Sequence, residues 1–230
     1  MRIAKYIANA GVCSRREAEK LIKQNKVFIN EKCCDHPSLK VTENDKITIN
    51  KKIIKLNTEV RLWKLYKPVK TICTNNDPRN RKNIFSLIPK NFPRMISIGR
   101  LDFMSEGLLL LTNNGDFARK YELPLSNILR VYRVCINGNI NPTDLMNINK
   151  GIRINSAEYN KVNVKLEKFK TPYTWLIFKM REGKNREIRN ICKFFMWNIV
   201  NLVRIQYGSI KLIKQKPGEI IEVLNFNSNL

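Results

Sequence analysis

The sequence is poor in the residues that bind metal ions. It contains one histidine, His36, and its six cysteines form no C-x-x-C pair, so no Cys/His set has the spacing of a zinc site. Cys33 and Cys34 beside His36 come nearest to a ligand cluster, but groups so close in sequence more often form an ordinary turn. A glycine-rich phosphate loop is absent too. We expect reduced thiols and no metal.

Acidic residues are also scarce. The chain has 19 Asp and Glu residues against 43 Lys and Arg, which gives a formal net charge of +24. Beyond residue 60 the carboxylates are scattered, whereas a metal-dependent nuclease requires a cluster of them, so that class is disfavoured. The positive excess, present before and after residue 60, favours a polyanionic partner such as RNA. Solubilising charge or a lysine-rich bias of the coding genome is the alternative explanation.

Long hydrophobic runs are missing as well. No apolar stretch could span a bilayer, and the first residues are amphipathic, without the continuous apolar core of a secretory signal. We therefore expect a soluble, cytoplasmic protein.

Local signals divide the chain into residues 1–50, a linker at 51–60, and a larger domain at 61–230. A helix is expected over residues 2–10, with Gly11 as its left-handed cap. Ser14 and Glu17 then form the pattern of a capping box, which opens a second helix that ends near Gln24. A short strand follows at 26–30.

The larger domain contains many strand-like segments and few helical ones. The clearest helix is expected at about 186–196, where apolar residues recur at helical spacing. Because strands and helices do not alternate strictly, we predict an α+β fold with a mainly antiparallel mixed sheet.

One loop has the features of an active site. Asp102 lies between Arg100 and Gly107, directly before an apolar strand at 108–112. Catalytic groups are often found on loops that rigid elements hold in place. A structural strand bounded by turn residues would also produce this pattern.

The loop sequence Gly99-Arg100-Leu101-Asp102, with Gly107 and the leucine run, resembles the signature of RNA pseudouridine synthases. Further matches follow in the family's order, and together they point to the RsuA/RluB/RluE/RluF branch, which modifies ribosomal RNA: Lys67-Pro68 with Thr74, Arg130–Val134, Glu182–Arg189, and Leu202–Arg204 with Gly208. The N-terminal helices, with the sequence Ser14–Glu19, resemble the RNA-binding module named for the fourth small-subunit ribosomal protein.

The resemblance implies that the protein isomerises a specific uridine of ribosomal RNA to pseudouridine, without a cofactor. Large-subunit RNA is the favoured substrate, either free or in a ribosome assembly intermediate, and small-subunit RNA is the alternative. A monomer is the default expectation. A non-catalytic RNA-binding or ribosome-assembly protein on the same scaffold is the second class of function that we consider.

The resemblance also assigns roles to individual residues. Asp102 would be the catalytic nucleophile, and Arg189 would pair with it and keep it ionised. Tyr132 would pack its ring on the target base, and Leu202 would form the apolar wall of the pocket. A core tyrosine, a surface arginine and a core leucine are the ordinary alternatives.

Other basic residues are expected to bind substrate. Arg100 and Lys67 would orient phosphates or loops near the site, while Arg16 and Lys20 share a helix face and could follow phosphates. Two positions depart from the family pattern. Lys70 stands where glycine is usual, which leaves the local loop geometry open, and Ser105 replaces the usual threonine but keeps the hydroxyl.

Overall fold

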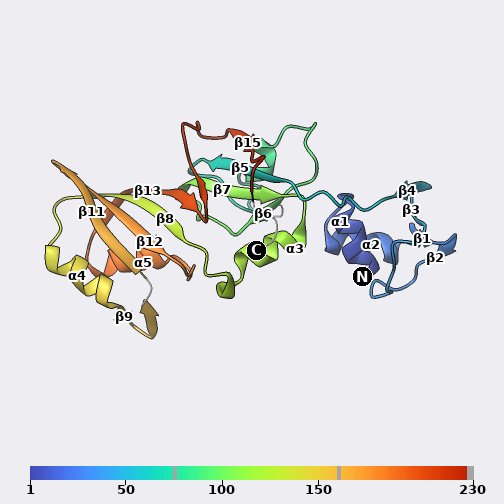
Figure 1. Cartoon of the computed structure of the whole chain (residues 1–230), viewed down its shortest axis with the longest axis horizontal. Helices are drawn as coiled ribbons and strands as arrows, with labels where there is room; N and C mark the ends of the chain where they lie inside the picture. Colours follow the sequence, from blue (N-terminus) through green and yellow to red (C-terminus); the bar gives the residue numbers. More distant parts are fainter. Residues whose placement is uncertain (75–76, 160–161, 227–230) are drawn as a thin grey trace.

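The computed structural model describes residues 1–74, 77–159 and 162–226. The helices, including two short 3-10 helices (η), are α1 (Ile3–Asn9), α2 (Arg15–Lys23), η1 (Ile84–Leu87), α3 (Gly115–Glu122), η2 (Pro124–Ser126), α4 (Pro142–Lys150) and α5 (Glu187–Phe194). None of these helices is long and apolar enough to cross a membrane. The chain forms a small N-terminal unit and a larger unit, which are connected by an extended segment (Figure 1).

The small unit packs α1 and α2 against a sheet of order β2-β1-β3-β4, which contains β1 (Val27–Ile29), β2 (Lys32–Cys33), β3 (Ile47–Ile49) and β4 (Lys52–Ile54). Both predicted helix boundaries are confirmed. Gly11, just beyond the C-cap of α1, has a φ of +78°. The Ser14 hydroxyl accepts a hydrogen bond from the Glu17 N–H, and the Glu17 carboxylate accepts one from the Ser14 N–H.

The small unit extends further than the sequence predicts. β4 pairs with β3, and Ile54 packs into the small core at 9% exposure. The turn between them places Asn50 and Lys51 at φ of +48° and +66°, which are the dihedrals of a tight hairpin without its usual glycine. The predicted linker at 51–60 therefore begins too early, and the irregular connection covers residues 55–61.

The larger unit is built on one extended sheet of order β11-β12-β8-β13-β7-β5-β15. β6 joins it beside β7 and β14 beside β13, while β9 and β10 form a separate hairpin. The strands are β5 (Leu62–Lys67), β6 (Ile96–Ile98), β7 (Glu106–Thr112), β8 (Arg130–Asn137), β9 (Ile152–Ile154), β10 (Ala157–Tyr159), β11 (Val162–Lys170), β12 (Tyr173–Met180), β13 (Asn198–Tyr207), β14 (Ile210–Lys211) and β15 (Ile220–Glu222).

The predicted mainly antiparallel mixed sheet is confirmed. β13 and β7 run parallel, and the other pairings described in this sheet are antiparallel. This parallel pairing divides the sheet into two halves: β5, β6, β7 and β15 on one side, and β8, β11, β12 and β13 on the other.

The leucine run of β7 is buried on both faces of the sheet. Leu108 and Leu110 pack toward α3, whereas Leu109 and Leu111 pack with Trp63 and the region of η1. Such burial explains why the run is continuous and does not alternate with polar residues.

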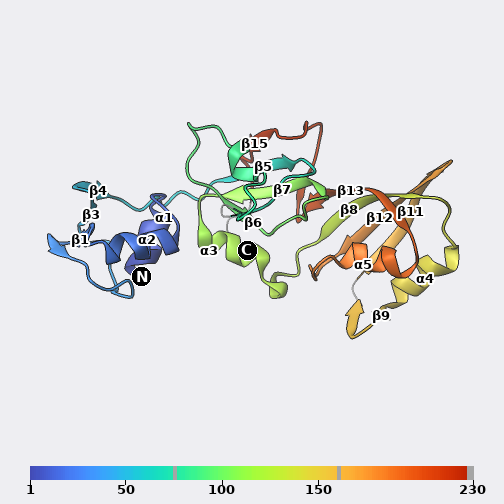
Figure 2. The same ribbon diagram turned by 180° about the vertical axis from the view of Figure 1, so that it is seen from behind.

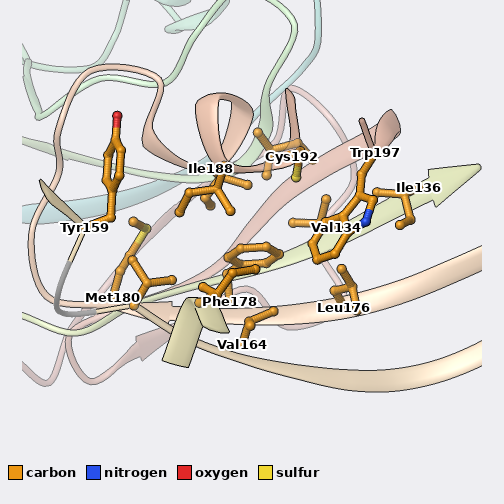
Figure 3. Close-up of a cluster of buried hydrophobic side chains, with 14 residues drawn as sticks. Val134, Ile136, Tyr159, Val164, Leu176, Phe178, Met180, Ile188, Cys192 and Trp197 are labelled. Carbon is orange, nitrogen blue, oxygen red and sulfur yellow. The ribbon is translucent and has the colours of Figure 1, made fainter. Parts of the chain in front are cut away.

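The other half of the sheet has helices on one face. Alternate residues of β8 and β12, among them Val134, Leu176 and Phe178, pack against Ile188 and Cys192 of α5 (Figure 3). Both views of the fold show α4 and α5 on the same side of these strands (Figures 1 and 2). This core fixes the position of α5 relative to β8 and β13.

Gly107 is located where the two halves meet. It pairs with Arg204 of β13, and a Cβ at this position would lie 2.8 Å from the Arg204 backbone nitrogen and closer still to its carbonyl oxygen. Its φ of +100° is also unsuited to other residues. β7 and β13 can therefore approach this closely because residue 107 has no side chain.

We expect Gly107→Ala to destabilise the protein by roughly 3 kcal/mol or more, because backbone strain adds to a backbone clash. Gly138→Ala is the matched control, since Gly138 has a φ of +92° but open space around a Cβ. It should lower the free energy of unfolding by only about 1 kcal/mol. Urea unfolding of both variants measures the difference, and equal losses would contradict the close approach described here.

Candidate active site

The predicted catalytic loop connects β6 to β7 and is held from several sides. The Gly99 N–H donates to the Glu122 carboxylate of α3 over 2.7 Å. The Ser105 N–H donates to the Asp102 carbonyl over 3.1 Å, which closes a turn around Asp102. The Asp102 side chain keeps 34% exposure and is thus available to a ligand.

Lys67 anchors this loop from inside the protein. Its side chain is fully buried, and its Nζ donates to the carbonyls of Ser105 at 2.8 Å and Pro68 at 2.9 Å. Burial lowers the pKa of Lys67 to about 8, against the attraction of Cys73, Asp102 and other acidic groups nearby. Of the two roles expected for Lys67, orienting phosphates or loops, these contacts support the second.

Lys70 adopts the backbone geometry that glycine normally provides. Its φ is +56°, and its N–H donates to the Phe103 carbonyl over 2.7 Å. The departure from the family pattern is thus accommodated with the bend intact. The Lys70 backbone becomes a further anchor for the loop around Asp102, while its side chain faces solvent.

Arg189 reaches Asp102 from α5, in the other half of the sheet. Its Nε lies 3.5 Å from Asp102 Oδ2, while its Nη2 donates to the Met104 carbonyl at 2.9 Å and the Ser105 hydroxyl at 3.0 Å. Burial lowers the pKa of Arg189, and the neighbouring Asp102 carboxylate opposes that shift. An arginine stays charged even so, so it places a positive charge beside the Asp102 carboxylate.

A second guanidinium near Asp102 was not singled out from the sequence. Arg186, the N-cap of α5, lies 3.7 Å from Asp102 Oδ2 and keeps 55% of its side chain exposed. Its φ of +51° positions it before the first helical residue. The sequence shows that Arg186 and Arg189 are one helical turn apart. Arg186 nevertheless precedes the first helical residue, so helical spacing alone does not place the two side chains together.

Tyr132 and Leu202 face the same cavity as Asp102. The cavity has a volume of about 1110 Å³ and is lined by both residues together with Arg100, Asp102 and Arg189. Leu202 is 5% exposed, which suits an apolar wall, and Tyr132 is half-buried between two hydrophobic clusters. Their strands, β8 and β13, are adjacent, so both residues are set in place by the sheet.

Arg204 is a buried cation that sequence reasoning left without a role. It is 2% exposed, its Nε donates to the Leu108 carbonyl at 2.6 Å, and its guanidinium lies 5.0 Å from the Tyr207 ring centroid. It borders the cavity and, within the described part of the chain, its Nη2 is buried without a hydrogen-bond partner.

Glu187 is a buried acid beneath the same cavity. Its exposure is 3%, and its carboxylate accepts a hydrogen bond from the Lys184 N–H at 3.1 Å. Burial, reinforced by the nearby Glu182, raises the pKa of Glu187 to about 7. Its hydrogen bond with Lys184 closes the turn before α5, the helix that presents Arg189.

The remaining predicted residues are exposed. Arg100 borders the cavity, whereas Arg16 and Lys20 lie on the solvent face of α2 in the small unit, outside the cavity.

The two units touch through an ion pair of 2.7 Å between Lys5 and Asp116. Among the described residues, His, Cys, Asp and Glu side chains do not gather into a group that could hold a metal ion.

Comparisons with known proteins place both parts of the chain in known families. A family model described as RNA pseudouridylate synthase matches residues 61–194, and one described as S4 domain matches residues 1–47. An uncharacterised RNA pseudouridine synthase of Rickettsia prowazekii is 45% identical over 97% of this chain and 94% of the relative. The ribosomal large subunit pseudouridine synthase B of Bacillus subtilis is 36% identical over 96% and 91%.

One solved structure, a crystal structure of a pseudouridylate synthase, covers 97% of this chain and 96% of its own. The match has a TM-score of 0.67 at 23% identity, which shows that the two folds are similar.

We expect Lys67→Met to remove a pH dependence of stability. Below pH 8 the lysine is charged in both the folded and unfolded states, and its burial opposes folding. Between pH 8 and 10.5 the folded form releases its proton first, so the free energy of unfolding rises with pH. The free energy of unfolding of the wild type, measured relative to that of the variant, should therefore rise by about 3 kcal/mol across that window.

Urea unfolding at four pH values from 7 to about 10 tests this expectation. Lys64→Met, on the same strand but partly exposed, controls for the loss of a lysine. Parallel stability curves for the wild type and Lys67→Met would show that the buried amine does not titrate in this range.

Proposed function

Because the chain belongs to the RNA pseudouridine synthase family, we propose that it converts a specific uridine of ribosomal RNA to pseudouridine, with Asp102 as the nucleophile. Relatives named ribosomal large subunit pseudouridine synthase B support large-subunit RNA as the substrate. The S4 domain and the net charge of +24 support binding of a large RNA.

The observation that carries the proposal is the meeting of four side chains around one cavity. Asp102, Tyr132, Arg189 and Leu202 come from a loop, a helix and two strands that lie far apart in sequence. A protein that only binds RNA has no need of a carboxylate held between two guanidinium groups. An enzyme that attacks a sugar carbon does.

The reaction rearranges bonds within one nucleotide. The bond from uracil N1 to the ribose C1′ breaks, the base turns, and a new bond forms between C5 and C1′. The proton on C5 is released, and N1 takes up a proton. No electrons are exchanged and no group donor is consumed, so the proposed chemistry requires no cofactor.

Asp102 would act on the sugar in its ionised form. It would either attack C1′ directly or assist formation of a glycal intermediate. When a base fills the cavity, loss of water disfavours the carboxylate, and the Arg189 charge at 3.5 Å offsets that loss. Ser105 supports the pair, because its hydroxyl accepts a hydrogen bond from Arg189.

The base itself would contact Tyr132 and Leu202. A uridine extruded from RNA loses its stacking partners, and an aromatic ring replaces part of that loss. The Tyr132 hydroxyl would assist removal of the C5 proton once the new bond forms. Leu202 would close the apolar side of the pocket.

The small unit would position the RNA. Arg16 and Lys20 lie one helical turn apart on the exposed face of α2, opposite the buried Ala18 and Ile22. They would contact phosphates, which add salt-sensitive affinity without selecting the target uridine. We further propose that the protein acts as a monomer in the cytoplasm, which sedimentation of the purified chain and cell fractionation would test.

Asp102→Ala should abolish turnover, because the nucleophile is lost, while RNA affinity stays within a few-fold of wild type. The assay is release of tritium from uridine C5 in deproteinised large- and small-subunit RNA, supplied separately. Asp144→Ala, which removes a carboxylate from α4 outside the cavity lining, should retain wild-type rates.

Substantial turnover by Asp102→Ala would rule out the catalytic assignment. Release from small-subunit RNA alone would overturn the choice of substrate. If the wild type releases tritium from neither RNA, the assay is repeated on ribosome assembly intermediates, and failure there would leave an RNA-binding protein.

Replacing Arg16 and Lys20 together with glutamine should weaken RNA binding and flatten its salt dependence. Because two charges that neutralise phosphates are removed, the slope of log K against log salt should fall by about 1.4 to 1.8. Filter binding at several salt concentrations measures this slope. The control pair Lys211→Gln and Lys214→Gln removes equal charge from the larger unit. An unchanged slope for the Arg16 and Lys20 variant would mean that this face of α2 does not contact RNA phosphates.

A further inference from the structure

The sheet half made of β8, β11, β12 and β13 has a second face that α4 and α5 do not cover (Figures 1 and 2). Side chains alternate along each strand, so the residues between the core positions point to this side. We call this surface the outer face, and it consists of Arg133 on β8, Lys165, Glu167, Lys168 and Lys170 on β11, and Tyr173, Trp175, Ile177 and Lys179 on β12.

The strand register brings these residues together. Lys168 pairs with Trp175, Lys170 with Tyr173, and Lys165 with Ile177. Directly paired residues of antiparallel strands lie on the same face of a sheet. The outer face is therefore a continuous surface in which aromatic and basic side chains alternate.

Its charge is strongly positive. Five of the residues that define the outer face are cations, and Glu167 is the acidic member. Glu167 makes an ion pair of 2.6 Å with Arg133, so among the residues of that surface the four lysines have no carboxylate partner. A polyanion complements such a surface better than an apolar or acidic protein would.

Trp175 distinguishes the outer face from an ordinary solvated surface. Trp63 and Trp197 are buried, whereas Trp175 is partly exposed on β12. The Arg133 guanidinium lies 4.2 Å and the Lys168 Nζ 5.6 Å from its ring centroid. An aromatic ring beside two cations offers stacking to a base and charge to the flanking phosphates.

Tyr173 extends the same surface. It is 41% exposed and lies two residues from Trp175 on the same strand face. Successive residues on one side of a strand are separated by about 6 to 7 Å, which allows an unstacked strand to contact both rings. A duplex would present its phosphates but hide the faces of its bases, so the two rings favour single-stranded RNA.

We propose that the outer face is a second RNA-binding surface, which holds a single-stranded segment of the substrate RNA outside the catalytic cavity. The proposal rests on the function proposed above. Tyr132 and Leu202 point to the opposite side of the same strands, so RNA on the outer face does not compete with a uridine in the cavity. A long ribosomal RNA can reach both sides of the sheet around its β11 edge.

Tryptophan fluorescence tests this contact directly, with a twelve-nucleotide oligouridine as the probe. Because the other two tryptophans are buried, stacking on Trp175 should quench the wild-type emission, and Trp175→Phe should abolish the quenching. Trp175→Ala should weaken oligouridine binding about fivefold or more. Quenching that persists in Trp175→Phe, or wild-type affinity in Trp175→Ala, would overturn the proposal.

Two lysines test the electrostatic part. Lys165→Gln with Lys168→Gln should lower the salt slope for large-subunit RNA by about 1.4, the value for two cations that neutralise phosphates of a single strand. KM should rise several-fold while kcat stays unchanged, because the cavity is untouched. Lys150→Gln with Arg153→Gln, on α4 and β9, is the matched control and should leave both unchanged.

An unchanged KM and salt slope in the lysine variant, with wild-type turnover intact, would refute RNA binding by the outer face. The enzyme assignment would still stand. Absence of turnover by the wild type would refute the proposed function instead, while the fluorescence titration would still decide whether RNA contacts Trp175.

Discussion

The close parallel contact of β7 with β13 at Gly107 is the constraint on which the site depends. Asp102 belongs to one half of the large sheet, whereas Tyr132, Arg189 and Leu202 belong to the other. A side chain at position 107 would separate the strands at the point where the loop of Asp102 leads into β7. The absence of one Cβ therefore keeps the carboxylate within 3.5 Å of Arg189.

Basic residues serve two physically different purposes in this chain. Lys67 and Arg204 are buried and donate to carbonyls of the loop around Asp102 and of β7, so their charges organise the cavity from within. Such burial is unfavourable for a charged group, and the hydrogen bonds offset only part of the cost, since Lys67 keeps a lowered pKa and Arg204 Nη2 has no hydrogen-bond partner among the described residues. Arg16, Lys20 and the lysines of the outer face remain in solvent, where they are free to meet phosphates.

The two arginines at Asp102 also differ in exposure and in how firmly they are held. Arg189 is 17% exposed and bonded to the loop, so it is fixed relative to the carboxylate, while Arg186 is 55% exposed and more distant. A fixed, largely desolvated cation favours the ionised acid without reorganisation. Salt screens the exposed cation more strongly.

The sequence by itself determined the local elements of structure, because residues that are close together in the chain decide them. Ser14 and Glu17 cap a helix three residues apart, Gly11 ends another, and the unbroken leucine run indicates a strand buried on both faces, so these elements were predictable. The loop of Asp102 and its partner Arg189 were found through the resemblance to a family. Tertiary structure decided the rest, because burial depends on groups that arrive from distant segments. Lys67 becomes an internal anchor only when Ser105, 38 residues away, closes over it, and Arg186 reaches Asp102 only when β13 joins β7.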